Sequence, residues 1–233
     1  MLPASFASSS SLPNLTARLA VHTLLHEGAG ALGLQLDAQA LARLDAYAAL
    51  LQQWGRKINL TAIPVDEPQQ IAVQHFLDSL ACVARLPALA ELPSPTLIDV
   101  GSGAGFPGVL CALMRPDLRV TLVERVGKKG AFLLTLRREL GLTYTVESCD
   151  AEKLIAPDSR DGFGVAVSRA ALPPPQWLDM GRRLVATSGF VLAMMSDREA
   201  APQAADCVCL AEHPYELAGA RRRIITWQRQ VAR

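Results

Sequence analysis

The chain has 233 residues, of which 50% are hydrophobic, and its formal net charge is +1. This length and composition supply enough apolar side chains for a sizeable buried core in one large domain. The near-zero charge excludes a protein that attracts nucleic acid through its overall charge, so any basic surface has to be local.

Cysteine usage and hydropathy narrow the class further. The five cysteines are odd in number and scattered, which argues against a secreted disulfide framework and favours reduced thiols in the cytoplasm. Cys207 and Cys209 would share one face of a strand, but structural zinc needs four ligands and only His213 is near, so no metal site is expected. No apolar run reaches the length of a membrane span. We therefore expect a cytoplasmic monomer without membrane association.

The N-terminal part is predicted to be helical. Residues 1–14 are serine-rich and are expected to form a flexible tail, followed by a helical extension over residues 15–92. The first helix is placed at Leu15–Glu27 and the second at Asp37–Asn59, with Asp37 as its N-cap. The second helix has an apolar stripe at helical spacing, made of Tyr47, Leu51, Trp54 and Ile58.

A third helix is expected after Asp66, with Pro68 in its first turn. Three polar residues, His75, Asp78 and Ser79, fall on one side of it at spacings of three and four residues. They form either a solvated helix face or part of a site. The opposite, apolar side is made of Val73, Phe76, Leu77, Leu80 and Ala84.

The pattern changes after Leu92–Pro95, where short apolar runs alternate with helical segments. Apolar runs without alternation suit strands buried on both faces, and strand–helix alternation predicts a parallel, doubly wound sheet. The last two runs flank a loop that holds Pro214 and Gly219, so we expect them to pair antiparallel. Residues 93–233 are thus predicted to be a Rossmann-like domain that is compact with the extension. The expected strands are Thr96–Val100, Val120–Glu124, Tyr144–Glu147, Phe163–Ser168, Gly189–Met195, Cys207–Glu212 and Arg223–Gln228.

The stretch "LIDVGSGAGFPGVL", Leu97 to Leu110, combines a buried strand, a glycine-rich turn and the start of a helix. In open α/β sheets, ligands bind at the carboxyl ends of the strands. Gly101, Gly103 and Gly105 allow a tight turn and let a ligand approach the backbone closely. The stretch therefore predicts a nucleotide-binding loop.

Glu124 ends the next strand, about 20 residues past the loop, where a carboxylate accepts both ribose hydroxyls. The alternative for Glu124 is a solvated residue at a strand end. The dinucleotide pattern G-x-G-x-x-G places a pyrophosphate on the helix N-terminus, but Phe106 takes its sixth position here. Asp99 adds negative charge that disfavours a phosphate and suits the ammonium and sulfonium groups of S-adenosylmethionine. The residues favour this methyl donor over NAD and FAD.

Five motifs together resemble one known family. They are "NLT" at Asn59–Thr61, "HFLDS" at His75–Ser79, "LIDVGSGAGFPGV", "LVERVGKKGAFL" and "VSRA". In this order, from about Gln52 to Met195, they resemble the bacterial 16S rRNA (guanine-N7) methyltransferases, also called ribosomal RNA small subunit methyltransferase G or glucose-inhibited division protein B. The segments "FPG" and "GKK" make the match more specific than the glycine loop alone.

The resemblance implies an α/β fold of the class I S-adenosylmethionine-dependent methyltransferases. This fold is Rossmann-like, with a mostly parallel seven-stranded sheet, an antiparallel last strand and, in this family, a helical N-terminal extension. The resemblance also implies methylation of N7 of a specific guanine in a small-subunit rRNA loop near the decoding centre.

Carried over residue by residue, the resemblance assigns a cofactor site and a catalytic residue. Glu124 holds the ribose, Ala151 and Glu152 sit beside the adenine, and Arg169 in "VSRA" faces both the donor and the target base. The glycine loop contributes Gly101, Gly103, Gly105 and Phe106 to the cofactor.

The chain departs from the family pattern at two places. The family has an arginine where this chain has Asp150. The family also ends its fifth strand in Ala-Leu-Lys-Gly, where this chain reads Ala193–Ser196 with Met195 in place of the lysine. A cation at that position therefore has to come from elsewhere, or this chain depends on it less.

Methylation at N7 makes modest chemical demands. N7 of guanine carries an in-plane lone pair and no proton, so the reaction needs alignment and desolvation but no general base. A donor has to bind O6 while N7 stays free. Arg169 suits this role, and the alternative is that it braces the loop through backbone carbonyls. His75 and Asp78 are candidates for a wall of the substrate pocket.

RNA contact requires local positive charge. Lys128 and Lys129 are the preferred candidates because they follow the second strand at the ligand-side edge of the sheet. Each of the other basic groups is as well explained by a solvated face, and they are Arg56-Lys57, Arg125, Arg137-Arg138, Arg182-Arg183 and Arg221–Arg223.

The sequence thus predicts a cytoplasmic, S-adenosylmethionine-dependent rRNA (guanine-N7)-methyltransferase whose partner is small-subunit rRNA or the ribosomal subunit. Three alternatives remain open at this point. They are a methyltransferase with another substrate, a nicotinamide-dependent oxidoreductase, and a non-catalytic RNA-binding factor in ribosome assembly.

Overall fold

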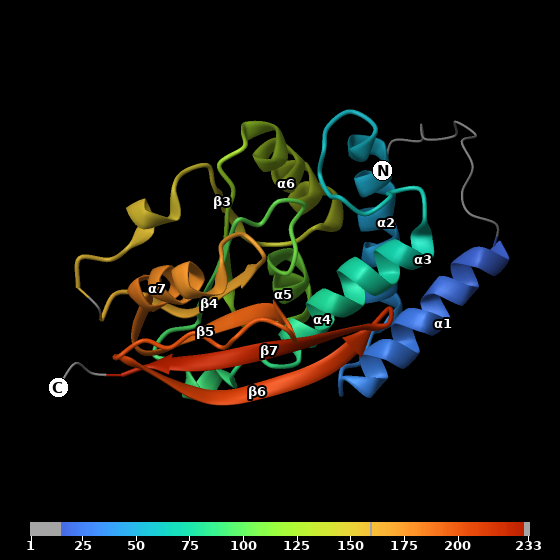
Figure 1. Cartoon of the computed structure of the whole chain (residues 1–233). Helices are drawn as coiled ribbons and strands as arrows, with labels where there is room; N and C mark the ends of the chain where they lie inside the picture. The colour runs from blue at the N-terminus through green and yellow to red at the C-terminus, as the bar shows by residue number, and fades with distance from the viewer. Residues whose placement is uncertain (1–14, 159, 231–233) are drawn as a thin grey trace.

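A computed structural model of the chain describes residues 15–158 and 160–230 and is built around one seven-stranded sheet in the order β3-β2-β1-β4-β5-β7-β6 (Figure 1). Strands β1 to β5 are parallel, whereas β7 runs antiparallel to both β5 and β6. The strands are β1 (Thr96–Val100), β2 (Arg119–Val123), β3 (Thr145–Glu147), β4 (Phe163–Arg169), β5 (Val185–Ser196), β6 (Cys207–Leu217) and β7 (Ala220–Arg229).

The N-terminal helices begin where the sequence predicts them. α1 spans Leu15–Ala31 and α2 spans Ala38–Gly55. Asp37 is the N-cap of α2, and its side chain accepts a hydrogen bond from the Ala40 amide at 2.7 Å. This satisfies one of the amides that a helix start leaves without a partner. Both predicted helices and the predicted cap are therefore confirmed, with end points that differ by a few residues.

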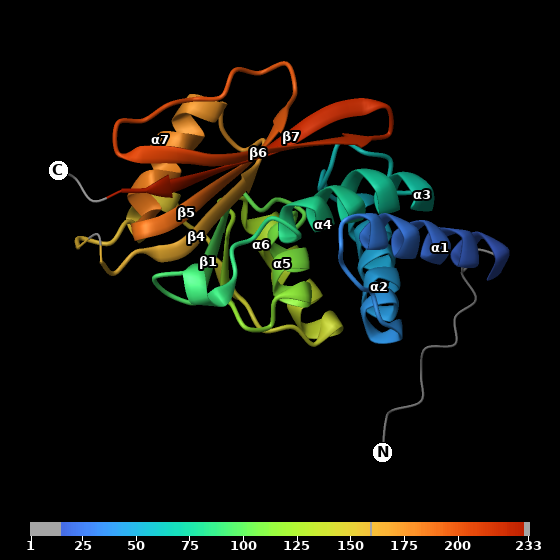
Figure 2. The same ribbon diagram turned by 90° about the horizontal axis from the view of Figure 1, so that it is seen from below.

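The third predicted helix is a composite of three segments. It comprises α3 (Pro68–Ile71), the π-helical segment η1 (Ala72–Leu77) and α4 (Asp78–Val83). His75, Asp78 and Ser79 are 2%, 0% and 0% exposed, so the interpretation of this trio as a solvated face is wrong. They are buried because this helix lies between the sheet and α1 (Figure 2).

Helices cover both faces of the sheet, which explains the continuous apolar runs of β1 and β4. Leu97 and Val165 pack into a core shared with α1, α2, η1, α4, α5 and α6. Ile98 and Ala166 point to the other face and pack with α7. The remaining helices are η2 (Leu89–Glu91), α5 (Gly108–Met114), α6 (Gly127–Leu140), η3 (Ala151–Leu154) and α7 (Pro174–Leu184).

Strands β6 and β7 form the expected antiparallel pair, but they are longer than predicted. Pro214 lies inside β6, opposite Arg223, and not in a loop. β6 is an edge strand, which is where sheets accommodate a proline. The turn is confined to Ala218 and Gly219, whose φ angles are 51° and 73°. Two residues with positive φ match the twist of a tight hairpin.

The sheet order and the antiparallel β7 confirm the predicted fold class. The division into an extension over residues 15–92 and a domain over residues 93–233 stays a prediction, and the expected tail at residues 1–14 lies outside the described residues. Among the helices formed by residues 15–158 and 160–230, none is long and apolar enough to cross a membrane.

Candidate functional site

The glycine loop lies at the carboxyl end of β1 and has the backbone conformation that its glycines predict. Gly101, Gly103 and Gly105 have φ angles of 72°, 57° and 95°, which side chains rarely adopt. A Cβ on Gly101 would overlap the Cβ of Ala171, and one on Gly105 would lie 2.6 Å from the Tyr47 hydroxyl oxygen. Glycine is therefore required at both positions by conformation and by space.

Glu124 closes the loop against the end of β2. Its carboxylate accepts hydrogen bonds from the Gly103 amide at 2.9 Å and from the Val126 amide at 2.7 Å, and the residue is only 7% exposed. The interpretation of Glu124 as a solvated residue at a strand end is therefore wrong. A carboxylate oxygen accepts more than one hydrogen bond, so each oxygen can also receive a ligand hydroxyl.

Asp99 lies under the loop and braces its second half. Its Oδ2 accepts from the Gly108 amide at 3.0 Å, whereas its Oδ1 is buried without a hydrogen-bond partner among the described residues. Burial raises the pKa of this carboxyl to about 6, and the hydrogen bond from the Gly108 amide and the positive charge of Arg169 limit the rise. Asp99 is 0% exposed, so its first effect is on the loop and the start of α5.

Phe106 anchors the loop to the N-terminal helices. Its ring stacks on His75 at 4.4 Å and on Tyr47 at 5.0 Å between centroids, and the residue is 2% exposed. The Tyr47 hydroxyl donates to the carbonyl of Ala104 in the loop at 2.5 Å. The cofactor contact of Phe106 stays a prediction, and only its backbone is in a position to make it, because its side chain packs against α2 and η1.

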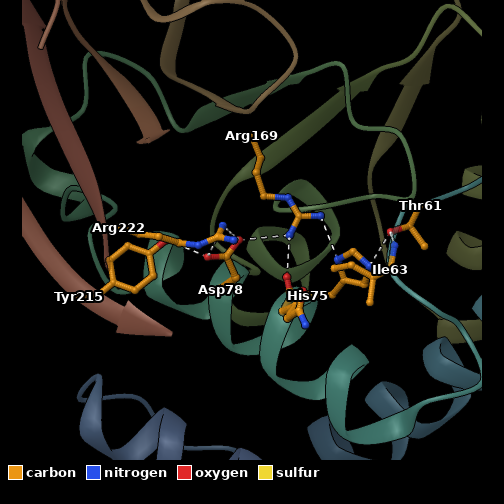
Figure 3. A network of polar contacts seen from close by, with 8 residues as sticks. Thr61, Ile63, His75, Asp78, Arg169, Tyr215 and Arg222 are labelled. Carbon is orange, nitrogen blue, oxygen red and sulfur yellow. Dashed lines mark hydrogen bonds and ion pairs between the residues drawn. The ribbon is translucent and has the colours of Figure 1, made fainter. Parts of the chain in front are cut away.

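Arg169 projects from the end of β4 onto η1 and the start of α4 (Figure 3). Its Nη1 donates to the Gln74 carbonyl and to Asp78 Oδ2, both at 3.2 Å, and its Nη2 donates to His75 Nδ1 at 3.0 Å. The guanidinium also lies 5.0 Å from the centroid of the Phe106 ring. These contacts use three of its five N–H groups and favour the bracing role, with two N–H groups left for a ligand.

Asp78 is the centre of this network and is fully buried. Besides Arg169, it accepts from the Tyr215 hydroxyl at 2.7 Å and from Arg222 Nη1 at 3.4 Å. Tyr215 and Arg222 face each other in the β6–β7 hairpin, which reaches over to the helix (Figures 2 and 3). Two cations and a hydroxyl satisfy the buried carboxylate, as a buried charge requires. The pKa of Tyr215 is raised by its own burial and by the Asp78 charge.

His75 is neutral, and its tautomer follows from its partners. Arg169 can only donate, so His75 Nδ1 accepts, and the proton sits on Nε2, which donates to Thr61 Oγ1 at 2.8 Å. Burial and, as the smaller cause, the Arg169 charge together lower the pKa of His75 to about 3. Both ring nitrogens are engaged, so His75 links Arg169 to the loop of Thr61 and Ile63.

The remaining predicted site residues lie at the same edge of the sheet but make fewer contacts. Ala151 is buried at the start of η3, after β3, whereas Glu152 is exposed and pairs with Arg183 at 3.7 Å. Lys128 is exposed and Lys129 is partly exposed in the first turn of α6. Among the described residues, neither lysine forms an ion pair, so both remain available to an anion.

Sequence reasoning missed four residues of the network, Tyr47, Thr61, Tyr215 and Arg222. Thr61 stands in the "NLT" motif, which was a usable signal, and Tyr47 stands in the predicted apolar stripe of α2. Arg222 was named only within the basic run Arg221–Arg223, and nothing in the sequence pointed to contact of Tyr215 or Arg222 with Asp78, which lies 137 and 144 residues away.

The sheet order, the glycine loop after β1 and the buried acid after β2 define a class I methyltransferase fold. Two solved structures are similar to the chain in fold. Magnesium protoporphyrin IX methyltransferase from Synechocystis PCC 6803, solved with bound SAM, is 14% identical with a TM-score of 0.56, over 84% of this chain and 98% of that one. MtNAS, in complex with MTA and tNA, is 13% identical with a TM-score of 0.54, over 94% and 90%.

Comparison of sequences identifies the family. The model of the GidB family, described as rRNA small subunit methyltransferase G, matches residues 40–223. A ribosomal RNA small subunit methyltransferase G from Anaeromyxobacter dehalogenans is 40% identical over 91% of this chain and 99% of that protein. One from Ralstonia nicotianae is 40% identical over 75% and 78%. The chain belongs to the rRNA small subunit methyltransferase G family and is an rRNA methyltransferase, as its motifs predict.

Proposed function

We propose that this chain uses S-adenosylmethionine to methylate N7 of one guanine in a small-subunit rRNA loop near the decoding centre. The observation that favours N7 over other guanine atoms is that the titratable groups beside the loop are already occupied by hydrogen-bond partners. Asp78 is held by two arginines, and neutral His75 has both nitrogens bonded. Neither is free to remove a proton, and N7 has none to lose.

The residues around the loop fit S-adenosylmethionine. A Cβ on Gly103 would have no neighbour closer than 3.8 Å, so the loop backbone is open on that side. Glu124 offers two carboxylate oxygens with spare lone pairs for the ribose, and Ala151 presents a small apolar surface for the adenine. Asp99 supplies negative charge below the methionine end. Phe106 in place of the third glycine of the dinucleotide pattern and the negative charge of Asp99 both disfavour a pyrophosphate, which favours this cofactor over dinucleotides.

The bound cofactor supplies a methyl carbon on a positively charged sulfur. The chain's own residues then have to align the guanine and exclude water. The lone pair of N7 forms the new N–C bond while the C–S bond breaks, so the charge moves from sulfur to the guanine and no proton is transferred. The rigid loop, held by Glu124, Asp99 and Tyr47, keeps the methyl carbon in one place during this displacement.

Arg169 is the proposed positioning group for the base. Its guanidinium plane is fixed by Gln74, Asp78 and His75, and two N–H groups remain for the O6 of guanine. Side-chain fixation by three partners lowers the entropy that the arginine loses on binding. Lys128 and Lys129 bind phosphates of the RNA backbone at the same edge of the sheet. We place the protein in the cytoplasm as a monomer, where small-subunit rRNA is its substrate.

The direct test is methyl transfer to unmodified rRNA. The chain is incubated with methyl-labelled S-adenosylmethionine and with either small ribosomal subunits or deproteinised 16S rRNA that lack the modification. We expect one labelled methyl group per RNA molecule. The RNA should be cleaved at that guanine after reduction and aniline treatment, as it is at N7-methylguanine. Label on another atom or another RNA, or binding of RNA without transfer, would overturn the proposal. Comparison of the two substrates also shows whether the enzyme needs the assembled subunit.

A further inference from the structure

A cavity of about 360 Å³ opens between the carboxyl ends of β4 and β5. Its volume falls within the range of small-molecule sites. It adjoins the glycine loop, because Ala171 lines the cavity and is the residue that a Cβ on Gly101 would strike. The wall away from the loop includes Met195 and Glu199.

Arg223 lies beside this wall. β5 and β7 are antiparallel and pair Met195 with Arg223, so the two side chains stand next to each other on one face of the sheet. The Nη2 of Arg223 also donates to the main-chain carbonyl of Glu199. Arg223 therefore touches one residue of the cavity wall and is the cross-strand neighbour of another.

The guanidinium of Arg223 is only partly satisfied. Its side chain is 15% exposed, and Nη1 donates to Glu212 at 2.7 Å. Its Nε is buried and has no hydrogen-bond partner among the described residues. A buried N–H without an acceptor costs free energy, so this group gains from a ligand oxygen.

The three consecutive arginines of β7 differ in what they contact. Arg222 faces the N-terminal helices and is bound to Asp78. Arg221 is 75% exposed and pairs with Asp197 at 3.5 Å. Of the three, Arg223 combines burial, a free donor and a place beside the cavity.

We propose that Arg223 binds a phosphate oxygen of the substrate RNA next to the target nucleotide and so positions the base over the cavity. A guanidinium matches the geometry of phosphate oxygens and remains charged at every working pH. This inference rests on the proposed function. The family pattern has a lysine at the position of Met195. Arg223, on the neighbouring strand, supplies a cation beside that position.

The test compares Arg223→Met with the double variant Arg223→Met and Met195→Lys. The single change should raise KM for 16S rRNA or subunits about tenfold and make the slope of log KM against log salt shallower by about 1, since one phosphate contact is lost. The affinity for S-adenosylmethionine should stay within twofold. In the double variant, an ammonium returns on the same face of the sheet and should restore most of the loss in KM and in salt slope.

Two control variants separate RNA contact from bracing. Glu212→Gln removes the charged partner of Arg223 but keeps the guanidinium, so KM for RNA should stay within twofold. Arg198→Met removes an exposed arginine of the β5–β6 loop and should also leave KM unchanged. If Glu212→Gln raises KM as much as Arg223→Met, Arg223 only braces the loop and the inference is wrong. An unchanged salt slope in Arg223→Met would equally overturn it.

Different results would refute the role of Arg223 and the proposed function. If the unaltered chain methylates no guanine N7, the proposed function fails, whatever the variants do. If the unaltered chain is active and Arg223→Met retains its KM and salt slope, only the role of Arg223 fails. Thermal unfolding of every variant shows whether a loss of activity reflects a loss of fold.

Discussion

The glycine loop and the Asp78 network lie side by side, yet they are held together by opposite means. The carboxylates that fix the loop are close to it in sequence and bind backbone amides, Asp99 that of Gly108 and Glu124 that of Gly103. Among the hydrogen bonds of the described residues, the one distant polar partner of the loop is the Tyr47 hydroxyl. Asp78 instead binds side chains that are 91, 137 and 144 residues away. Phe106 joins the two regions because its ring contacts both His75 and the Arg169 guanidinium.

This difference separates two kinds of function. A loop of local backbone contacts can hold the same cofactor in many proteins with the same fold. A network that needs four distant elements is specific to one arrangement of N-terminal helices and C-terminal hairpin. We therefore expect changes in the loop to act mainly on cofactor affinity, and changes in the network to act mainly on folding and on RNA.

The largest effect is expected for Asp78→Ala. The change leaves Arg169 and Arg222 without their shared anion and removes the acceptor of the Tyr215 hydroxyl. Removing one partner of a buried ion pair costs about 3–5 kcal/mol. Urea unfolding measures this loss. The control Asp66→Ala removes a carboxylate that is 71% exposed, and its effect should be within about 0.5 kcal/mol. Equal losses in the two variants would show that the network contributes no special stability.

Glu124→Ala should be the largest change in cofactor binding. It removes the acceptor of the Gly103 and Val126 amides together with the proposed ribose contact, a loss of about 3 kcal/mol, or roughly 100-fold in the Kd for S-adenosylmethionine. Titration calorimetry measures it. Glu124→Gln keeps one acceptor oxygen, so its Kd for S-adenosylmethionine should lie between those of the unaltered chain and Glu124→Ala. An unchanged Kd in Glu124→Ala would remove the loop from the cofactor site.

The stability of the protein should decrease as the pH falls from about 6.5 to 3. The pKa of His75 is lowered to about 3 in the folded state, so the unfolded chain binds the extra proton in this range. The pKa of Asp99 is raised to about 6, so the folded state binds a proton between about 6 and 4 and offsets part of the loss. The net contribution of the two groups is about 2 kcal/mol.

Urea unfolding at a series of pH values, in the unaltered chain and in His75→Gln, isolates the histidine. The stability of the unaltered chain relative to His75→Gln should decrease as the pH falls. Only the unaltered chain has a histidine here that is protonated on unfolding. A constant difference from pH 7 to pH 4 would show that His75 titrates normally in the folded protein.

Gly101→Ala should have the smallest effect, and it has a matched control. Gly101 and Gly141 both have positive φ, but a Cβ overlaps Ala171 only at Gly101 and meets open space at Gly141. Both alanine variants carry a backbone cost of about 1 kcal/mol. Gly101→Ala should in addition weaken S-adenosylmethionine binding several-fold, and Ala171→Gly in the same chain should restore it. If Gly141→Ala weakens binding equally, the overlap with Ala171 is irrelevant.

The predictable part of the molecule is the part whose causes are local. The strands follow from apolar runs, the cap of α2 from Asp37, and the loop from its glycines, so the sequence alone predicts the fold class and the region of the cofactor site. The burial of His75 and Asp78 could not be settled this way, because it depends on where the whole helix packs. The roles of Tyr215 and Arg222 depend on the register of β6 and β7, which the proline in β6 concealed.

The sequence separation within the Asp78 network has a consequence for synthesis of the chain. Asp78 emerges long before Arg169, and Arg222 follows it by 144 positions. Until the β6–β7 hairpin has been made, a folded helix would bury this carboxylate with incomplete neutralisation, which is unfavourable. The glycine loop can take its shape earlier, since its partners are nearby in the chain. The order of synthesis thus delays completion of the Asp78 network until the β6–β7 hairpin has been made, after the partners of the glycine loop are already present.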